Sequence, residues 1–243
     1  MTCALCLQER PLRRSHIVPE FMHGQMYDAK HRFFGISSIA SKPNKLFQKG
    51  LREELLCAGC EQHIGRYESY ASRVFYGNPK ISVSPVPGGL LLKSLDYRIL
   101  KLFFLSLLWR FAVTKVEQYK GADLGPYTER LRERILKEDP GDVLTFPCMV
   151  IAVTQDGKHL PDFIVAPANT RFDGQRVWNF VIAGFLFSFF LGKTVPPTEL
   201  HAAFLQPEGL LFLQITEIRK IDYLYKFACE MGAAQRKRKA QRL

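Results

Sequence analysis

The sequence predicts an α+β protein with a metal-binding module at its N-terminal end. Two Cys-x-x-Cys pairs fall within the first 60 residues, residues 96–119 form a long apolar segment without glycine or proline, and strand-like segments follow from Val143 onward. Helical and strand-like segments both occur over residues 76–235, which predicts an α+β domain there. We expect a metal module over residues 1–77, a linker over 78–89, an α+β domain over 90–231 and a basic tail over 232–243.

The cysteine pairs are Cys3-x-x-Cys6 and Cys57-x-x-Cys60. Each pair can present two thiolates to one tetrahedral Zn²⁺, and two pairs complete a closed structural site. The alternatives are small buried hydrophobic residues or a redox pair. The separation of the pairs is too long for a simple zinc ribbon, so a segment is inserted between them. The other two cysteines, Cys148 and Cys229, lie in apolar contexts and are expected in the core.

Two helices are expected after the linker. The segment 96–119 is apolar around most of its circumference, which indicates a largely buried central helix. Residues 123–137 have Leu131 and Ile135 four positions apart among charged residues, which predicts a second, amphipathic helix. A final helix is expected from about Glu217 into the basic tail.

The strands are expected from Val143 onward. Gln155-Asp156-Gly157-Lys158 separates two apolar segments and predicts a hairpin with an Asp-Gly turn. Val177–Leu191 and Gly209–Thr216 are expected to add buried strands, with a core helix as the alternative for Val177–Leu191. We expect these strands to be antiparallel in the predicted α+β domain.

The composition restricts the class of partner. The 243 residues carry a net charge of +11 and are 47% hydrophobic, which excludes a disordered or collagen-like chain. The charge is concentrated at the two ends: +4 over residues 1–75 and +5 from Arg236 on, with +2 between them. A basic surplus favours a polyanion such as nucleic acid. The expected nucleic-acid contacts are Arg10, Arg13, Arg14, Arg236, Lys237, Arg238 and Lys239, although solvated basic side chains are the alternative.

The location follows from two further features. The first residues show no signal peptide, and the longest apolar stretch, Val177–Leu191, is too short to span a membrane as a helix. We therefore expect a cytoplasmic protein without a membrane partner.

One histidine element lies between the cysteine pairs. It reads Ser15-His16-Ile17-Val18-Pro19, and the second pair is preceded by two leucines and followed by Glu61. This order resembles the zinc-containing HNH (ββα-metal) endonucleases over about residues 3–75. The resemblance implies a treble-clef zinc module that hydrolyses DNA, with His16 as the general base that activates water. It also places Glu61 at the position that holds the catalytic cation, Mg²⁺ or Mn²⁺, and by analogy suggests defence against foreign DNA.

The sequence departs from the family pattern at two positions. Ser15 stands where the family commonly has an Asp or His metal ligand, and the Asn expected before the second cysteine pair has no clear match. Glu53 or Glu68 is the candidate for the missing carboxylate, and Glu68 lies two helical turns after Glu61 and thus on the same face. A solvated surface residue is the alternative for Glu68. His23, His31 and His63 are not assigned; a surface histidine is the expectation for His63.

Two other functions remain open. In the first, the zinc module binds nucleic acid or protein without catalysis, and Ser15 marks a decayed site. In the second, the cysteines only fasten the N-terminal segment to the α+β domain.

Overall fold

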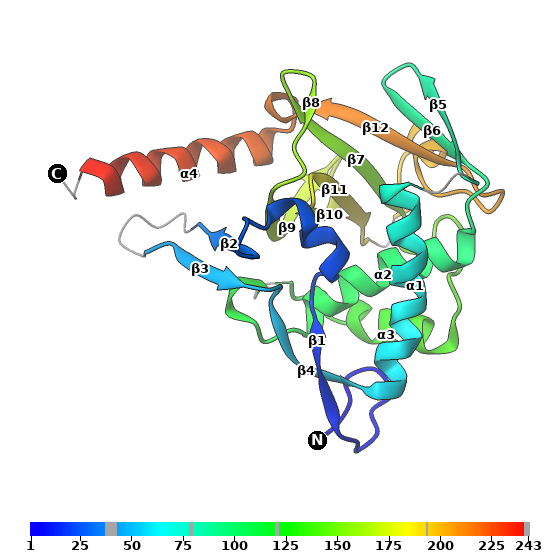
Figure 1. The fold of residues 1–243 in the computed structure, drawn as a ribbon. Coiled ribbons are helices and arrows are strands. Elements are labelled where there is room, and N and C mark those ends of the chain that lie inside the picture. Colours follow the sequence, from blue (N-terminus) through cyan, green and yellow to red (C-terminus); the bar gives the residue numbers. More distant parts are fainter. Residues whose placement is uncertain (37–42, 78–79, 120–121, 193, 241–243) are drawn as a thin grey trace.

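The computed structural model describes residues 1–36, 43–77, 80–119, 122–192 and 194–240. An eight-stranded sheet lies against a bundle of helices, and the N-terminal segment lies at the end of that bundle (Figure 1). The sheet contains β5 (Ser82–Val86), β6 (Gly89–Lys93), β7 (Cys148–Gln155), β8 (Lys158–His159), β9 (Ile164–Phe172), β10 (Gln175–Ile182), β11 (Phe185–Phe190) and β12 (Leu211–Glu217). The α+β class predicted from the sequence is confirmed.

The strand order is β5-β6-β12-β7-β11-β10-β9, and β8 pairs with β7. Its pairs are antiparallel with one exception, because β12 runs parallel to β7. The predicted antiparallel sheet is thus a mixed sheet. The chain reaches β12 from β11 through a long connection that includes a 3₁₀ helix, Thr198–Ala203, and not through a tight turn.

The central helix is α2 (Tyr97–Val113), which is buried on nearly all sides. Its N-cap is Asp96, whose carboxylate accepts the backbone N–H of Ile99 at 2.9 Å. One side of α2 packs on the sheet, with the rings of Phe111 and Phe180 4.8 Å apart. The helix ends at Val113, earlier than expected, and a 3₁₀ turn follows at Glu117–Tyr119.

Two further helices cover α2, namely α1 (Ala58–Tyr76) and α3 (Tyr127–Lys137). The predicted apolar face of α3 is confirmed, since Leu131 and Ile135 are fully buried. The helix begins at Tyr127 and not at Asp123, because the Asp123 carboxylate instead accepts the backbone N–H of Gly125 and forms a turn.

Two turns define the hairpins of the sheet. Asp156 and Gly157 have φ angles of 51° and 75° and connect β7 to β8 as predicted. Val177–Leu191 was expected as one strand, but it forms the hairpin β10–β11. Ala183 and Gly184 turn the chain there with φ angles of 52° and 73°. A Cβ at Gly184 would lie 2.0 Å from the carbonyl oxygen of Leu160, so this turn requires glycine.

The residues expected as a linker belong in part to the sheet. From Ser82 onward they form β5 and the start of β6, whereas residues 78 and 79 lie outside the described chain. β5 is an edge strand, which explains why Pro85 is tolerated within it. The proline-rich composition therefore marks a sheet edge here.

The N-terminal segment forms two small hairpins. β1 (Leu12–His16) pairs antiparallel with β4 (Arg52–Cys57), which runs directly into α1. A 3₁₀ helix at Glu20–Met26 and the hairpin of β2 (Arg32–Gly35) with β3 (Lys45–Gln48) lie between them. Buried residues of this segment, including Leu5 and Ile17, belong to the same apolar core as α2 and the sheet.

The last helix, α4 (Asp222–Ala240), follows a 3₁₀ turn at Ile218–Lys220 and extends away from the sheet (Figure 1). Its C-terminal half lies beside Asn44, the residue before β3, which hydrogen-bonds to Gln235 and Arg238. Only its beginning packs on the outer face of the sheet, through Leu224. For this reason Cys229 is exposed, and the expectation that it lies in the core is wrong; Cys148 is buried as predicted. Among the described residues, no helix is long and apolar enough to cross a membrane.

Candidate metal centre and histidine site

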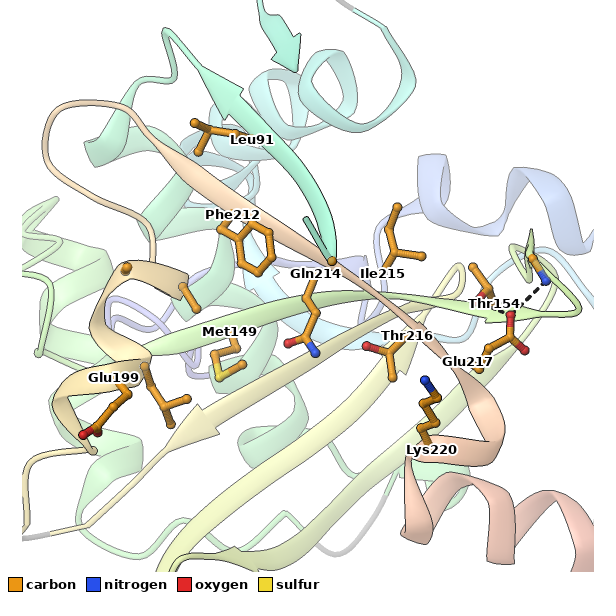
Figure 2. A pocket seen from close by; sticks show the side chains of 15 residues that line it. Leu91, Met149, Thr154, Glu199, Phe212, Gln214, Ile215, Thr216, Glu217 and Lys220 are labelled. Atoms are coloured by element: carbon orange, nitrogen blue, oxygen red, sulfur yellow. Dashed lines mark hydrogen bonds between the residues drawn. The ribbon is translucent and has the colours of Figure 1, made fainter. Parts of the chain in front are cut away.

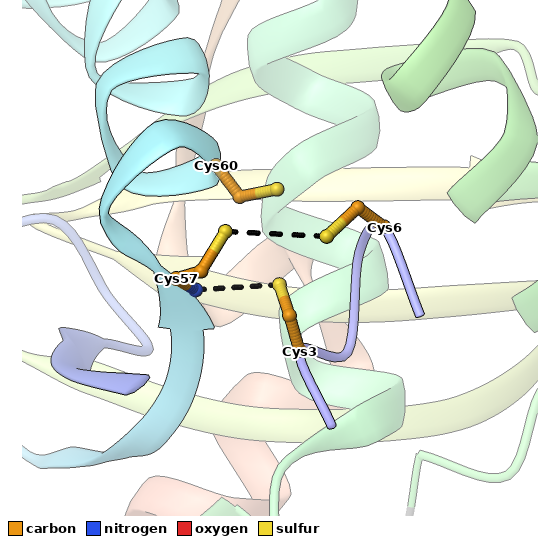
Figure 3. Close-up of side chains that lie close together, drawn as sticks. All are labelled: Cys3, Cys6, Cys57 and Cys60. Carbon is orange, nitrogen blue, oxygen red and sulfur yellow. Dashed lines mark hydrogen bonds between the residues drawn. The ribbon is translucent and has the colours of Figure 1, made fainter. Parts of the chain in front are cut away.

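The four paired cysteines meet at one point. Cys3 and Cys6 lie in the N-terminal turn, and Cys57 and Cys60 lie where β4 enters α1 (Figure 3). Their sulfur atoms all lie within 4.8 Å of one another, and three of the four residues are buried. The backbone N–H of Cys57 donates to Sγ of Cys3 at 3.3 Å. Such a cluster could hold a metal ion such as zinc, since four thiolates are a tetrahedral donor set that suits Zn²⁺.

The pKa values of the thiols also agree with a cation site at the four cysteines. Burial opposes ionisation of Cys57, but hydrogen bonds from the backbone and thiol of Cys60 lower its pKa to about 7. Burial raises the pKa of Cys60 well above its ordinary value, and the hydrogen bond to Cys57 raises it further. One thiolate therefore forms readily, while a bound cation is needed to stabilise several together.

His16 lies at the far end of β1 from the cysteines. It is paired with Arg52, whereas Leu12 is paired with Cys57. At about 3.3 Å per strand residue, the four steps from Leu12 to His16 place His16 roughly 13 Å along the hairpin from the cysteine end. The helix α1 also begins at the cysteines and rises about 1.5 Å per residue. Glu68 therefore lies about as far from the cysteines as His16 does, whereas Glu61 stays near them. The structure therefore brings His16 together with Glu68 and leaves Glu61 in the first turn of α1.

Arg110 of α2 connects His16 with Glu68. Its Nη1 donates to the carbonyl oxygen of His16 at 3.1 Å and to Oε1 of Glu68 at 2.6 Å. Arg110 is almost fully buried, so this ion pair is shielded from water. Glu68 is thus held as the counterion of an arginine.

The other candidate carboxylates have different roles. Glu53 accepts the backbone N–H of Lys115 at 3.0 Å, so it fixes the chain after α2. Oε1 of Glu61 is buried and has no hydrogen-bond partner among the described residues. Ser15 is buried, and its hydroxyl accepts the backbone N–H of Leu56 at 3.1 Å across the hairpin. Ser15 therefore stabilises the strand pair and points away from His16, its neighbour along the strand.

The imidazole of His16 has two charged neighbours. Nε of Arg52 donates to Nε2 of His16 at 2.8 Å. Oε2 of Glu20 lies 2.8 Å from the same Nε2 atom. Burial lowers the pKa of His16 and the positive charge of Arg52 lowers it further, while the charges of Glu20 and Glu68 oppose this shift. His16 is therefore a neutral imidazole at neutral pH, which is the form that accepts a proton.

Three more side chains surround Glu20. The Tyr27 hydroxyl donates to Oε1 of Glu20 at 2.9 Å, and Nε2 of His31 lies 3.3 Å from the same oxygen. His23 is completely buried, and its Nδ1 lies 3.2 Å from the carbonyl oxygen of Pro19. Within the described parts of the chain, three or more potential metal ligands converge at the cysteines alone. The side chains around His16 thus form a cluster of mixed charge and not a closed metal site.

The remaining predicted residues are placed as follows. His63 is not a surface histidine, because its Nε2 lies 2.8 Å from the carbonyl oxygen of Ile135 and connects α1 to α3. The expected nucleic-acid contacts Arg10, Arg13 and Arg14 are exposed, and the β1–β4 register shifts between Arg13 and Arg14. Arg236, Lys237, Arg238 and Lys239 lie in the last turns of α4, where Arg238 donates to the side chain of Asn44 at 2.7 Å.

Sequence reasoning missed Glu20, Arg52 and Arg110. Glu20 follows His16 by four residues, which is a detectable local signal. Arg110 is a lone arginine within an apolar helical segment, Trp109-Arg110-Phe111, and such a buried charge needs a partner. Arg52 carries no local signal, because only the strand pairing places it beside His16.

A hollow lies apart from both clusters, on the outer face of the sheet between the Thr198–Ala203 helix and the turn before α4 (Figure 2). It has a volume of about 800 Å³ and contains Met149, Gln214 and Lys220 among its lining residues. The carboxylate of Glu217 at its edge accepts the Thr154 hydroxyl at 2.9 Å and the backbone N–H of Gly157 at 2.8 Å. Glu217 thus stabilises the β7–β8 turn, and the hollow presents no group comparable with the histidine cluster.

Fold and site together define an α+β protein with a four-cysteine cluster that could hold a metal ion. Comparison with known proteins found no matching protein-family model, no matching curated protein and no matching solved structure.

Proposed function

We propose that this protein is a nuclease of the HNH type that hydrolyses phosphodiester bonds of DNA. The observation that carries the proposal is the position of His16. It ends the first strand of an antiparallel pair whose second strand runs through the cysteine cluster into a helix. This strand–strand–helix order agrees with the resemblance seen in the sequence.

The proposed chemistry is general-base catalysis by His16. The pKa of His16 lies below its ordinary value, so Nε2 is unprotonated at neutral pH and can take a proton from water once Arg52 no longer donates to it. The exposed arginines of β1, Arg13 and Arg14, lie on the strand that carries His16 and would contact the phosphate backbone.

The catalytic Mg²⁺ or Mn²⁺ implied by the resemblance belongs to the proposal as well. Such an ion would stabilise the charge that develops on the phosphate. The side chains around His16 do not form a ready-made cation site, because two arginines are part of the cluster. We therefore assign no residue to this ion. The requirement for the cation is tested separately, by cleavage in the presence of EDTA.

A plasmid-nicking assay tests the proposal. The wild-type protein should nick supercoiled DNA with Mg²⁺ or Mn²⁺, and His16→Ala should reduce the rate by about 10²-fold or more because the base is lost. His159→Ala is the matched control, since His159 is exposed on β8. Cleavage that survives His16→Ala would refute this mechanism, and cleavage in EDTA would refute the cation requirement.

The exposed basic end of α4 favours a second candidate, a zinc module that binds nucleic acid without cleaving it. For this candidate, no nicking occurs, but DNA binding weakens as salt increases. Removal of residues 236–243, which carry a charge of +5, should then reduce the slope of log affinity against log salt concentration by up to about 4.5, because each phosphate contact contributes about 0.9.

A further inference from the structure

Nε2 of His16 has two neighbours of opposite charge at the same distance. Nε of Arg52 lies 2.8 Å away, and so does Oε2 of Glu20. Arg52 reaches the histidine from the neighbouring strand β4, and Glu20 from the 3₁₀ helix that follows β1. The side chains of His16 and Glu20 are partly exposed, so a ligand can approach from solvent.

The two contacts are of different kinds. Arg52 donates a hydrogen bond to Nε2, which requires the electron pair of the neutral imidazole. Oε2 of Glu20 is buried and has no hydrogen-bond partner among the described residues, although it lies so close to Nε2. Only a protonated Nε2 could donate to Glu20. One nitrogen atom therefore cannot satisfy both neighbours at the same time.

The groups that face this nitrogen nearly balance in charge. Arg52 and Arg110 are positive, Glu20 and Glu68 are negative, and the Arg110–Glu68 ion pair lies on the α2 and α1 side. The second histidine of the cluster, His23, has a pKa lowered to about 4 by burial and stays neutral at neutral pH. Tyr27 and His31 contact the other oxygen of Glu20. A small rearrangement at His16 is therefore enough to change which neighbour is favoured.

Gly50 provides the space for such a rearrangement. A Cβ at this position would lie 3.0 Å from Cδ2 of His16 and 3.2 Å from Oε2 of Glu20. A side chain there would press on both groups. The lack of one leaves the imidazole room to turn from Arg52 toward Glu20.

We propose that Arg52 and Glu20 exchange as partners of Nε2 during phosphodiester cleavage, Arg52 binding the phosphate and Glu20 acting as a positioning residue. This rests on the nuclease function proposed above. Before the reaction, Arg52 holds His16 neutral. When a substrate phosphate binds, the guanidinium turns to the phosphate oxygens, for which its planar donor array is well suited. Nε2 is then free to act as the base.

The step moves one proton from water to Nε2 and one proton from solvent to the leaving oxygen. An O–H bond of water breaks and its proton moves to Nε2, while the water oxygen forms a bond to phosphorus. The bond from phosphorus to the leaving oxygen breaks, and that oxygen takes a proton from solvent. The new Nε2–H donates to Oε2 of Glu20, and the proton then returns to solvent. Glu20 stabilises the imidazolium, and Arg52 stabilises the charge on the phosphate.

An NMR titration of the His16 imidazole in the full-length, zinc-loaded protein tests the exchange without any need for cleavage. Glu20→Gln should lower the pKa of His16 and Arg52→Gln should raise it, each by about one unit, because one removes a negative and the other a positive neighbour. Glu54→Gln is the matched control on the exposed face of β4. Zinc content and near-ultraviolet circular dichroism equal to wild type show that the variants are folded.

Inorganic phosphate serves as the probe for the arginine. At millimolar concentration it should raise the pKa of His16 in the wild-type protein and leave Arg52→Gln unchanged, because the guanidinium is the proposed phosphate ligand. Shifts of the same sign in Glu20→Gln and Arg52→Gln, or a phosphate effect that persists in Arg52→Gln, would overturn the exchange.

Nicking assays separate this inference from the nuclease function. If the protein nicks DNA, Glu20→Gln should reduce kcat by about 10-fold or more and shift the acid limb of the pH profile toward lower pH, while Arg52→Gln mainly raises KM. If the wild type does not nick DNA, the nuclease function and the catalytic roles of both residues fail together. Opposite pKa shifts combined with nicking that is unchanged in both variants would overturn these roles alone and leave the nuclease function standing.

Discussion

At the scale of single residues, His23 shows how burial controls charge. The side chain is completely buried beside the rings of Tyr27 and Phe33, and its Nε2 has no partner within the described chain. Burial lowers the pKa of His23 from its ordinary value to about 4. A proton on this ring would create a buried charge without a suitable partner.

His23 should therefore make the protein sensitive to acid. The unfolded chain takes up this proton near pH 6.5 and the folded chain only near pH 4, so the free energy of unfolding falls between these values as the pH is lowered. The loss amounts to about 3 kcal/mol. His23→Phe should remove this contribution to the pH dependence of the free energy of unfolding, as measured by urea denaturation at pH 7, 5.5 and 4.5. His201→Phe, outside this cluster, should keep the wild-type pH dependence; equal slopes for wild type and His23→Phe would contradict the prediction.

At the scale of elements, α1 joins the two halves of the site. Its first turn carries Cys60 and Glu61, while Glu68 lies two turns further on and forms the ion pair with Arg110 of α2. Between them, His63 contacts α3 through the carbonyl oxygen of Ile135. The cysteine cluster thus lies at the start of the helix whose middle supports the surroundings of His16.

Loss of the metal should weaken this whole element. We expect the wild type to contain about one zinc per chain, and Cys60→Ser to lose it together with roughly 10 °C or more in Tm, because the four-thiolate site contributes to folding. Cys229→Ser is the matched control, since Cys229 is exposed on α4. Elemental analysis and thermal denaturation measure both effects. Zinc far below one per chain in the wild type would refute the assignment of the cysteines.

At the scale of the whole molecule, the helices and the sheet share one aromatic core. The ring of Phe187 on β11 lies 5.6 Å from Phe104 of α2, 5.3 Å from Phe180 of β10 and 6.4 Å from Phe75 of α1. Buried residues of the N-terminal segment belong to the same core. The metal module and the sheet should consequently unfold together.

Phe187→Ala tests this cooperativity. The substitution should cost about 3–5 kcal/mol, because it removes a fully buried ring from the core. In both wild type and variant, zinc release and loss of far-ultraviolet circular dichroism should coincide during urea denaturation. Phe172→Ala, at a half-exposed ring on β9, should cost much less. Zinc release at a clearly lower urea concentration would show that the N-terminal module unfolds by itself.

Some features of this protein follow from the sequence alone. The buried central helix, the amphipathic helix at Leu131 and Ile135 and the Asp156-Gly157 turn are encoded locally, by periodicity or turn residues. The Cys-x-x-Cys spacing within each pair predicted that the four cysteines meet, although the two pairs lie far apart in the chain. The apolar segment 177–191 gave no local signal of a hairpin, because buried residues on both sides of the Ala183-Gly184 turn conceal the reversal of the chain.

The partners of His16 required the tertiary structure. Arg52 lies 36 residues from it and Arg110 lies 94 residues away, and they reach it from another strand and from the central helix. A local pattern contains information about residues a few positions apart, whereas these contacts depend on how β4, α1 and α2 pack. For the same physical reason the sequence predicted Glu61, beside the cysteines, as the partner of His16. The length of the β1–β4 hairpin instead places His16 near Glu68.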